Sequence, residues 1–339
     1  MTTQRIHYID TLRGFAIFLV TLGHVLEECG YRGMPLFQFI YSFHMPLFFC
    51  ISGFVMSLSF ERKMQSNNKI TIKKVTKFIY AKFKGIMVPY YAWSLLALPL
   101  FFYCYNGTLN YRNTLNAVFV TNTSFWFLPC LFGLSIVYIL YKFALNKVNL
   151  KYRNNAIPKV LACMLLATVL FALYYYTKYD FIRSIMSYIL PFFIGVFMSE
   201  YKKINELICD NTYIYTLSFI AFCLTVGLFI SPPNGIVEKA SRLVCGLLSI
   251  PVLFNFFKNT NIHPGLKNIM EYTGRNTLII YILQFRFIQL LPNIPDLNIF
   301  MQVCILSAIS ILLIAFILLI SMFFEKSTYT SLIFLGKKQ

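Results

Sequence analysis

The chain has 339 residues, of which 58% are hydrophobic and only 12% are charged. Soluble domains carry about 25% charged residues, so this composition excludes an ordinary soluble protein. Repeated apolar stretches of about twenty residues predict an all-α, polytopic membrane bundle with about ten transmembrane helices. No soluble segment or internal repeat interrupts them, which predicts a single membrane-embedded domain over residues 1–339.

The formal net charge of +18 comes from Lys and Arg residues that lie mostly between the apolar stretches. Cytoplasmic loops of membrane proteins are rich in these residues, so topology explains the charge without a nucleic-acid partner. The nine cysteines are scattered singly and form no C-x-x-C pair. We therefore expect packing residues rather than disulfides or metal ligands.

The distribution of charge also predicts the orientation of the spans. Connections after the second, fourth, sixth and eighth spans are rich in Lys and Arg, whereas the opposite loops are poorer. By the positive-inside rule, both termini then face the cytoplasm. The predicted spans begin near Ile9, Leu36, Phe83, Phe125, Pro158, Arg183, Tyr213, Val237, Gly274 and Asn298.

Two ionisable residues, Arg13 and His24, lie in the first predicted span, "YIDTLRGFAIFLVTLGH". Eleven helical steps turn about 1100°, so both side chains point the same way, about 16 Å apart along the axis. Asp10 lies three residues before Arg13, close enough to pair with it. A central Arg costs about 2.5–3.5 kcal/mol in a membrane and normally faces a bundle interior or a wet cavity. Each residue alone fits an interfacial anchor, but together they favour a functional cavity.

The second predicted span supplies His44, in "FHMPLFFCISGF", at about the depth of His24. Two imidazoles without an acidic partner make a poor metal site, so we expect no metal. A histidine titrating near neutral pH suits general acid–base catalysis far better. Gly14 and Gly23 in the first span would let another helix or a ligand come close.

The segment that follows the second span, from Glu61 to Lys84, carries eight Lys and Arg residues against one Glu. One interpretation is an amphipathic helix that lies on an anionic inner leaflet. The alternative is that some of these lysines attract a phosphorylated cytosolic ligand.

The later predicted spans contain fewer polar groups. Trp126 opens the fourth span, where it belongs to an interfacial aromatic belt or contacts a substrate. Arg242 lies near the start of the eighth predicted span, where we expect an outward-facing polar group. Asn276 and Gln284 in the ninth are either interhelical hydrogen-bonding groups or ligand contacts.

Six sequence blocks together resemble the membrane-bound acyltransferase-3 family, bacterial acyl-CoA-dependent O-acyltransferases that modify cell-surface glycans. The blocks occur in the family's order over nearly the whole chain: "IDTLRG" with His24, "SFHMPLFFCISGF", "PYY" at Pro89, "WFL" at Trp126, "FFIG" and "TGRNTLIIYIL". Two positions depart from the family pattern. Gly85 stands where an arginine is frequent, and Gln284 stands where a histidine is frequent.

The resemblance implies transfer of an acyl group, with acetyl expected, from cytosolic acyl-CoA (acetyl-CoA) to a polysaccharide hydroxyl. The acceptor would be a cell-surface or lipid-linked glycan, such as an O-antigen, capsule or exopolysaccharide, at the bacterial inner membrane. We expect four residues in catalysis, namely His24, Arg13, Asp10 and His44, and three at the donor, namely Arg13, Lys82 and Lys84. The expected acceptor contacts are Trp126, Arg242, Asn276 and Gln284. Membrane lipids would be the remaining partners.

Two other classes of function fit a bundle of this kind. A transporter or flippase for a lipid-linked sugar would spread polar groups over many helices, whereas this chain concentrates ionisable groups in the first two spans. A receptor or assembly protein would need no chemistry.

Overall fold

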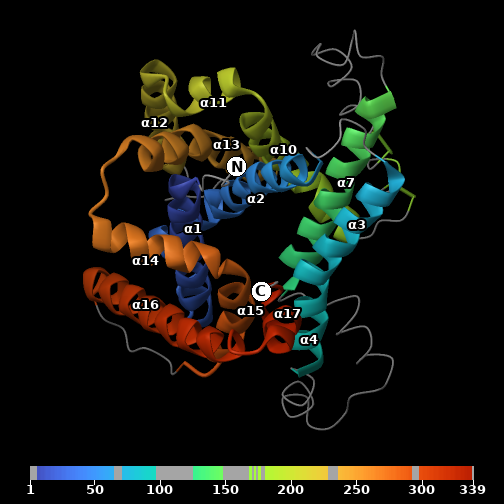
Figure 1. The fold of residues 1–339 in the computed structure, drawn as a ribbon. Coiled ribbons are helices and arrows are strands. Elements are labelled where there is room, and N and C mark those ends of the chain that lie inside the picture. The colour runs from blue at the N-terminus through green and yellow to red at the C-terminus, as the bar shows by residue number, and fades with distance from the viewer. Residues whose placement is uncertain are drawn as a thin grey trace. The chain divides into compact units, whose positions relative to one another are not determined.

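The computed structural model describes residues 6–64, 71–96, 125–147, 168–169, 172, 175–176, 180–227, 236–291 and 298–337. Every regular element within these ranges is a helix, so the prediction of an all-α protein is confirmed there (Figure 1). The chain divides into two compact units. One comprises Met1–Phe54 and Ile194–Lys326, and the other comprises Val55–Phe193 and Ser327–Gln339.

Among the described residues, six helices are long and apolar enough to cross a membrane, which is consistent with an integral membrane protein. They are α1 (His7–Glu28), α2 (Pro35–Met64), α7 (Phe127–Lys147), α10 (Asp180–Glu200), α13 (Ile236–Asn259) and α16 (Ile299–Phe324). A seventh span is possible if α11 (Lys202–Cys209) and α12 (Thr212–Gly227), bent by 56°, cross together.

The remaining predicted spans differ from the structure in kind. Near Gly274, where the ninth span was expected to start, α14 (Pro264–Arg275) ends. The helix that follows, α15 (Thr277–Ile288), has only 12 residues. The stretch beginning near Phe83 is described only as far as Leu96. Of the span beginning near Pro158, the structure describes only residues 168–169, 172 and 175–176. A count of ten therefore stays a prediction.

Helix α1 is the centre of the first unit, where it packs against α13, α14, α15 and α16 (Figure 1). Glycines bring α1 and α14 into backbone contact. A Cβ on Gly14 would overlap the carbonyl oxygen of Met270, and a Cβ on Gly274 would overlap that of Asp10. The close approach expected at Gly14 is thus confirmed, and it fixes the helix that carries Arg13 and His24.

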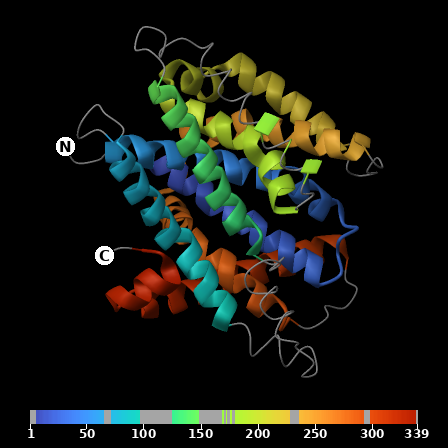
Figure 2. The same cartoon turned by 90° about the vertical axis from the view of Figure 1, so that its right-hand side faces the viewer.

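The second unit contains the end of α2, α7, the start of α10, and a run of three helices (Figure 2). This run is α3 (Ile72–Lys82), the π-helix η1 (Phe83–Met87) and α4 (Val88–Leu96). Phe60 of α2 packs against Phe78 of α3 and Tyr138 of α7, with ring centroids 5.2 and 5.4 Å apart. These contacts join the three helices. The C-terminal helix α17 (Thr328–Leu335) packs against α4 and η1.

Candidate functional site

His24 lies in a polar cluster formed by α1 and α2. Its Nδ1 atom is 3.3 Å from Glu27 Oε2 and 3.3 Å from the Tyr41 hydroxyl. Tyr41 donates to Glu27 Oε2 at 2.7 Å, and Arg32 donates to Glu27 Oε1 at 2.7 Å. The ring of Phe285, from α15, packs on the imidazole with centroids 4.3 Å apart. His24 is 18% exposed, so it is held by neighbours while its ring stays accessible.

The predicted set of site residues did not contain Glu27 or Tyr41. Glu27 follows His24 by three residues, a spacing that places both on one helical face, so the sequence held a signal for it. Tyr41 comes from the next helix and carries no such signal. Gly23 admits it, because a Cβ there would lie 2.9 Å from Tyr41 Cε2.

His44 is buried, and the hydrogen bond of its side chain is to the backbone of its own helix, α2. Its Nδ1 lies 2.8 Å from the carbonyl oxygen of Ile40, and its ring packs on Tyr41 with centroids 4.8 Å apart. The Tyr41 ring thus contacts both His44 and His24, with centroids 4.8 and 6.3 Å away. Within the described part of the chain, no group of three His, Cys, Asp or Glu side chains could hold a metal ion.

Arg242 of α13 joins the cluster through a chain of hydrogen bonds. It donates to Glu238 Oε1 and to Gln38 Oε1, both at 3.0 Å. Gln38 Nε2 in turn donates at 2.8 Å to the carbonyl oxygen of Arg32, whose side chain binds Glu27. Two guanidinium groups and two carboxylates thus surround the end of α1 that carries His24.

Arg13 occupies a second position on α1, near the start of α15. Its Nη1 lies 3.7 Å from Asp10 Oδ1, and its Nη2 donates to Thr277 Oγ1 at 2.8 Å. Asn276, the neighbouring residue, donates instead to the carbonyl oxygen of Tyr272 at 2.9 Å and lies where α14 ends and α15 begins. The structure therefore brings Asp10 to Arg13 and uses Asn276 at the helix junction.

Gln284 of α15 is fully buried against α1. Thr21, one turn before His24, donates to Gln284 Oε1 at 2.7 Å. Gln284 Nε2 is buried and has no hydrogen-bond partner among the described residues. Such an atom costs about 1–3 kcal/mol and calls for a water or a ligand.

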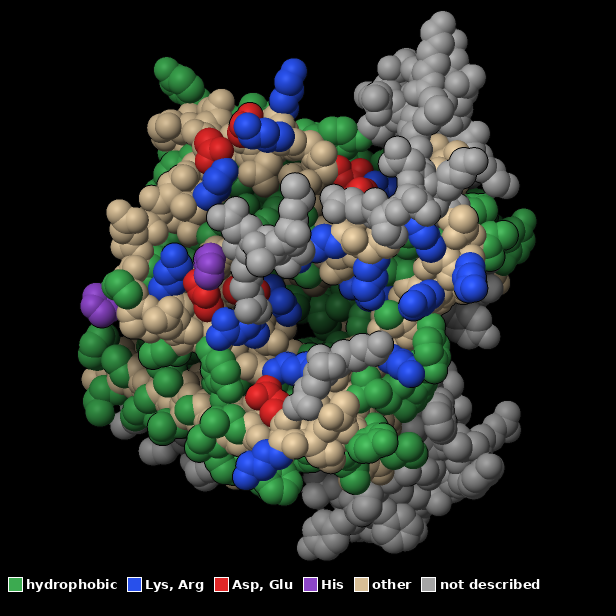
Figure 3. Space-filling view, in the orientation of Figure 1, with side chains coloured by type: hydrophobic (Ala, Val, Ile, Leu, Met, Phe, Trp, Pro, Cys, Tyr) green, Lys and Arg blue, Asp and Glu red, His purple; other side chains and the backbone are tan. Residues whose placement is uncertain are grey.

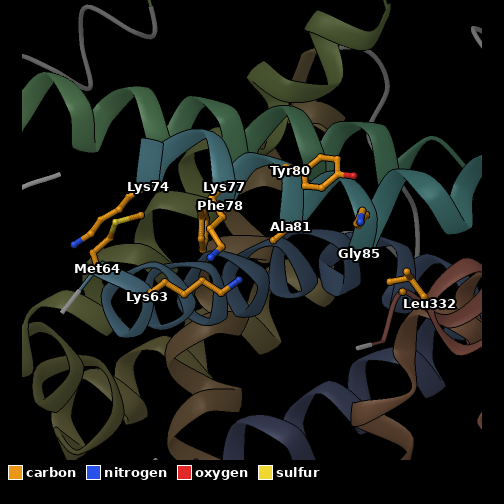
Figure 4. Close-up of a pocket in the computed structure, with 11 residues that line it drawn as sticks. Lys63, Met64, Lys74, Lys77, Phe78, Tyr80, Ala81, Gly85 and Leu332 are labelled. Carbon is orange, nitrogen blue, oxygen red and sulfur yellow. The ribbon is translucent and has the colours of Figure 1, made fainter. Parts of the chain in front are cut away.

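A cavity of about 710 Å³ lies in the second unit, and we call it the basic cavity (Figure 4). Its walls contain four lysines and no acidic residue among the described ones. The lining residues are Lys63, Met64, Lys74, Lys77, Phe78, Tyr80, Ala81, Lys84, Gly85, Leu332 and Gly336. Figure 3 shows Lys and Arg side chains gathered over the end of α2 and over α3.

The two lysines expected at the donor are placed differently. Lys84 lines the basic cavity, with its Nζ 4.5 Å from the centroid of the Tyr80 ring. Lys82 does not line it, and its Nζ lies 5.3 Å from the centroid of Phe78. Trp126 stacks on Tyr188 with centroids 5.5 Å apart and does not line the cavity.

The predicted residues thus fall into two groups. The first unit holds Asp10, Arg13, His24, His44, Arg242, Asn276 and Gln284, and the second holds Lys82, Lys84 and Trp126. Lys63, Lys74 and Lys77 were part of the basic stretch in the sequence, but nothing in their spacing singled them out from its other cations.

A family model described as an acyltransferase domain matches residues 6–324. The chain belongs to this acyltransferase-3 family. It is also similar to two nodulation proteins NolL. The one from Mesorhizobium japonicum is 41% identical over 68 residues, which is 18% of each chain. The one from Sinorhizobium fredii is 46% identical over 54 residues, 14% of this chain and 15% of the relative. The chain thus spans less than a fifth of these curated relatives, and no solved structure matches it.

Proposed function

We propose that this acyltransferase moves an acyl group, with acetyl expected, from cytosolic acyl-CoA to a hydroxyl of a cell-surface or lipid-linked polysaccharide. The observation that carries the proposal is the contact of His24 with Glu27 and Tyr41, in a chain that belongs to an acyltransferase family. An accessible imidazole that a neighbouring carboxylate orients is suited to general-base catalysis.

The chemistry follows from the contacts of the ring. When Nδ1 carries the proton, its N–H is directed at Glu27 Oε2, and Nε2 has a free lone pair. Nε2 takes the proton of the acceptor hydroxyl while the hydroxyl oxygen attacks the thioester carbonyl. The new C–O bond forms, the C–S bond breaks, and the imidazolium returns its proton to the departing thiolate. An acyl-histidine intermediate, in which Nε2 itself attacks the thioester, is the alternative route.

His44 has a supporting role in this proposal. Its Nδ1 is bound to the Ile40 carbonyl and its side chain is buried, so it packs beneath Tyr41 rather than meeting the acceptor. Arg242 donates to Gln38, and Gln38 donates to the backbone carbonyl of Arg32. Arg242 thereby helps to position the Arg32 side chain, which binds Glu27. Both residues then position the cluster.

Arg13 and Gln284 offer the polar groups for the donor and acceptor within the first unit. Asp10 and Thr277 fix the Arg13 guanidinium, which is 26% exposed and can meet a carbonyl or phosphate oxygen. Gln284 Oε1 accepts from Thr21, and its buried Nε2, which has no hydrogen-bond partner among the described residues, would donate to a substrate oxygen.

Donor phosphates would bind in the basic cavity. Phosphate groups bind Lys side chains strongly where several cations share a water-poor space. Lys84 and the other cavity lysines then contact the donor. Lys82 packs on the ring of Phe78, which lines the cavity, and so helps to position that ring. In this arrangement ten spans form one acyltransferase domain in the bacterial inner membrane, with both termini and the lysines on the cytoplasmic side.

The test is acyl transfer by purified protein in lipid nanodiscs, with radiolabelled acetyl-CoA and an extracted surface glycan. We expect His24→Ala to lower the rate by about 10²–10⁴-fold, because general-base catalysis contributes that much. His263→Ala is the matched control, since His263 is exposed and its side chain makes no capping bond. Transfer at the wild-type rate by His24→Ala would refute the proposal. A wild-type protein that moves lipid-linked sugar without consuming acyl-CoA would be a flippase instead.

A further inference from the structure

Most cations of the basic cavity have no counter-ion in the part of the chain that the structure describes. Lys63, Lys77 and Lys84 line the cavity and form no hydrogen bond or ion pair with any described residue. Glu61, the acid of the same basic segment, is bound by Lys142 Nζ at 2.7 Å. Like charges that share one space repel each other, so an anion in the cavity would stabilise this arrangement.

The lengths of α2 and α3 indicate where the cavity lies in a membrane. With 30 residues, α2 is about 45 Å long, whereas the hydrocarbon core of a bilayer is about 30 Å thick. The last turn of α2 carries Arg62 and Lys63, whose charges are costly in hydrocarbon. The 11 residues of α3 are too few to cross a bilayer. The cavity between these elements therefore lies at the level of the lipid headgroups.

Exposed apolar side chains border the lysines on α3 and η1. Ile72 is 69% exposed, and Tyr80, which lines the cavity, is 58% exposed. Phe83, next to Lys84, is 36% exposed. Lysines beside exposed aliphatic and aromatic residues are typical of a helix at the membrane interface. The rim of the cavity is thus suited to contact with hydrocarbon chains.

The basic cavity combines the two chemistries that a phospholipid needs. Figure 4 shows Lys63 from α2 and Lys77 from α3 directed toward the same space, with Lys74 at one end. This space suits a phosphate, and the volume of about 710 Å³ is within the range of small-molecule sites. A zwitterionic headgroup brings a cation of its own, which the lysines repel. The charges therefore favour an anionic phospholipid.

We propose that the basic cavity binds the headgroup phosphate of an anionic phospholipid, whose acyl chains lie against the exposed side of α3. Lipid and acyl donor then exclude each other, because both need the same lysines. This exclusion rests on the proposed function, which places the donor phosphates in the cavity, whereas the lipid site itself does not. Donor binding thereby becomes sensitive to the anionic lipid content of the membrane.

The experiment compares three soluble probes by isothermal titration calorimetry, with the protein in phosphatidylcholine nanodiscs and empty nanodiscs as background. Short-chain phosphatidylglycerol carries an anionic headgroup and acyl chains. Short-chain phosphatidylcholine carries the same chains with a zwitterionic headgroup, and glycerol phosphate carries the phosphate without chains. We expect phosphatidylglycerol to bind at least about tenfold more tightly than either of the other probes.

Two pairs of variants separate the cavity from the membrane surface. Lys77→Gln should weaken phosphatidylglycerol binding about fivefold, because it removes a cavity cation. Lys73→Gln removes the same charge at an exposed position that does not line the cavity, and it should change binding by less than about twofold. Ile72→Ser should weaken phosphatidylglycerol about threefold and leave CoA unchanged, because soluble CoA does not need the apolar side of α3. Leu266→Ser, at a position 53% exposed on α14 in the other unit, should change neither.

Competition is measured as the dissociation constant of CoA with and without each short-chain lipid. We expect phosphatidylglycerol to weaken CoA binding in proportion to its own occupancy of the site, and phosphatidylcholine to leave it unchanged. Three results would overturn the lipid site: equal binding of the two lipids, binding of glycerol phosphate as tight as that of phosphatidylglycerol, or equal loss in Lys73→Gln and Lys77→Gln.

The same measurements keep the two proposals apart. CoA that binds to the wild type and is not displaced by phosphatidylglycerol refutes the lipid inference and leaves the donor site in place. Phosphatidylglycerol binding that depends on Lys77, in a protein that binds no CoA, supports the lipid site and refutes the donor site of the proposed function.

Discussion

Replacement of Glu27 by Gln tests how the structure prepares His24 for catalysis. The Glu27 carboxylate contacts His24 Nδ1 at 3.3 Å and accepts hydrogen bonds of 2.7 Å from Tyr41 and from Arg32. Gln has the same shape but no charge, so it keeps the packing of the cluster. What it removes is the negative charge that stabilises the imidazolium while His24 holds the proton of the acceptor.

The size of the effect follows from these contacts. A hydrogen bond to a charged group contributes about 1.5–3 kcal/mol. The contact to His24 is long, and Glu27 is 28% exposed, so water screens part of the charge. The lower end of the range applies, about 1.5 kcal/mol, which corresponds to about a tenfold fall in kcat.

The assay measures kcat and the KM for acetyl-CoA separately, in nanodiscs, with saturating glycan acceptor. We expect kcat to fall and the donor KM to stay constant, because Glu27 belongs to the His24 cluster and does not line the basic cavity. Glu28→Gln is the matched control, because this substitution removes the same charge at the next residue, and the Glu28 side chain is exposed. A fall no larger in Glu27→Gln than in Glu28→Gln would show that Glu27 does not act on His24.

Three further predictions concern packing, the buried amide and the basic cavity. Gly14→Ala places a methyl group against the Met270 carbonyl, so it should lower stability by about 1–3 kcal/mol in thermal unfolding, whereas Gly227→Ala, with open space around it, should not. Gln284→Leu removes a buried amide whose Nε2 has no partner among the described residues, so the Tm should stay constant or rise while the transfer rate falls. A lower Tm with wild-type transfer would show that Gln284 is purely structural. Lys77→Gln should weaken acetyl-CoA binding about fivefold at low salt and less at high salt, because Lys77 lines the basic cavity. Lys73, exposed on the same helix but not lining the cavity, provides the control, and an equal loss in Lys73→Gln would contradict a specific site.

The sequence by itself determined the features that depend on helical geometry and composition. Apolar stretches specified helices, and the spacing of Asp10 and Arg13 brought the two side chains within 3.7 Å. Glu27 follows the same rule, because residues three apart on a helix are neighbours whatever the rest of the chain does. The order of the short motifs also identified the family that the match over residues 6–324 shows.

The tertiary structure alone decided which helices meet. Tyr41 reaches His24, Gln284 reaches Thr21, and Gly336 reaches Gly85 from positions far apart in the chain, so no local spacing encodes these contacts. Lys82 and Lys84, both predicted to contact the donor, show that even residues close in the sequence can be placed differently by the tertiary structure. Lys82 ends α3 and packs on Phe78, whereas Lys84 lies within the π-helix and turns into the basic cavity. A π-helix changes the angular step from one residue to the next, and that change depends on packing rather than on sequence periodicity.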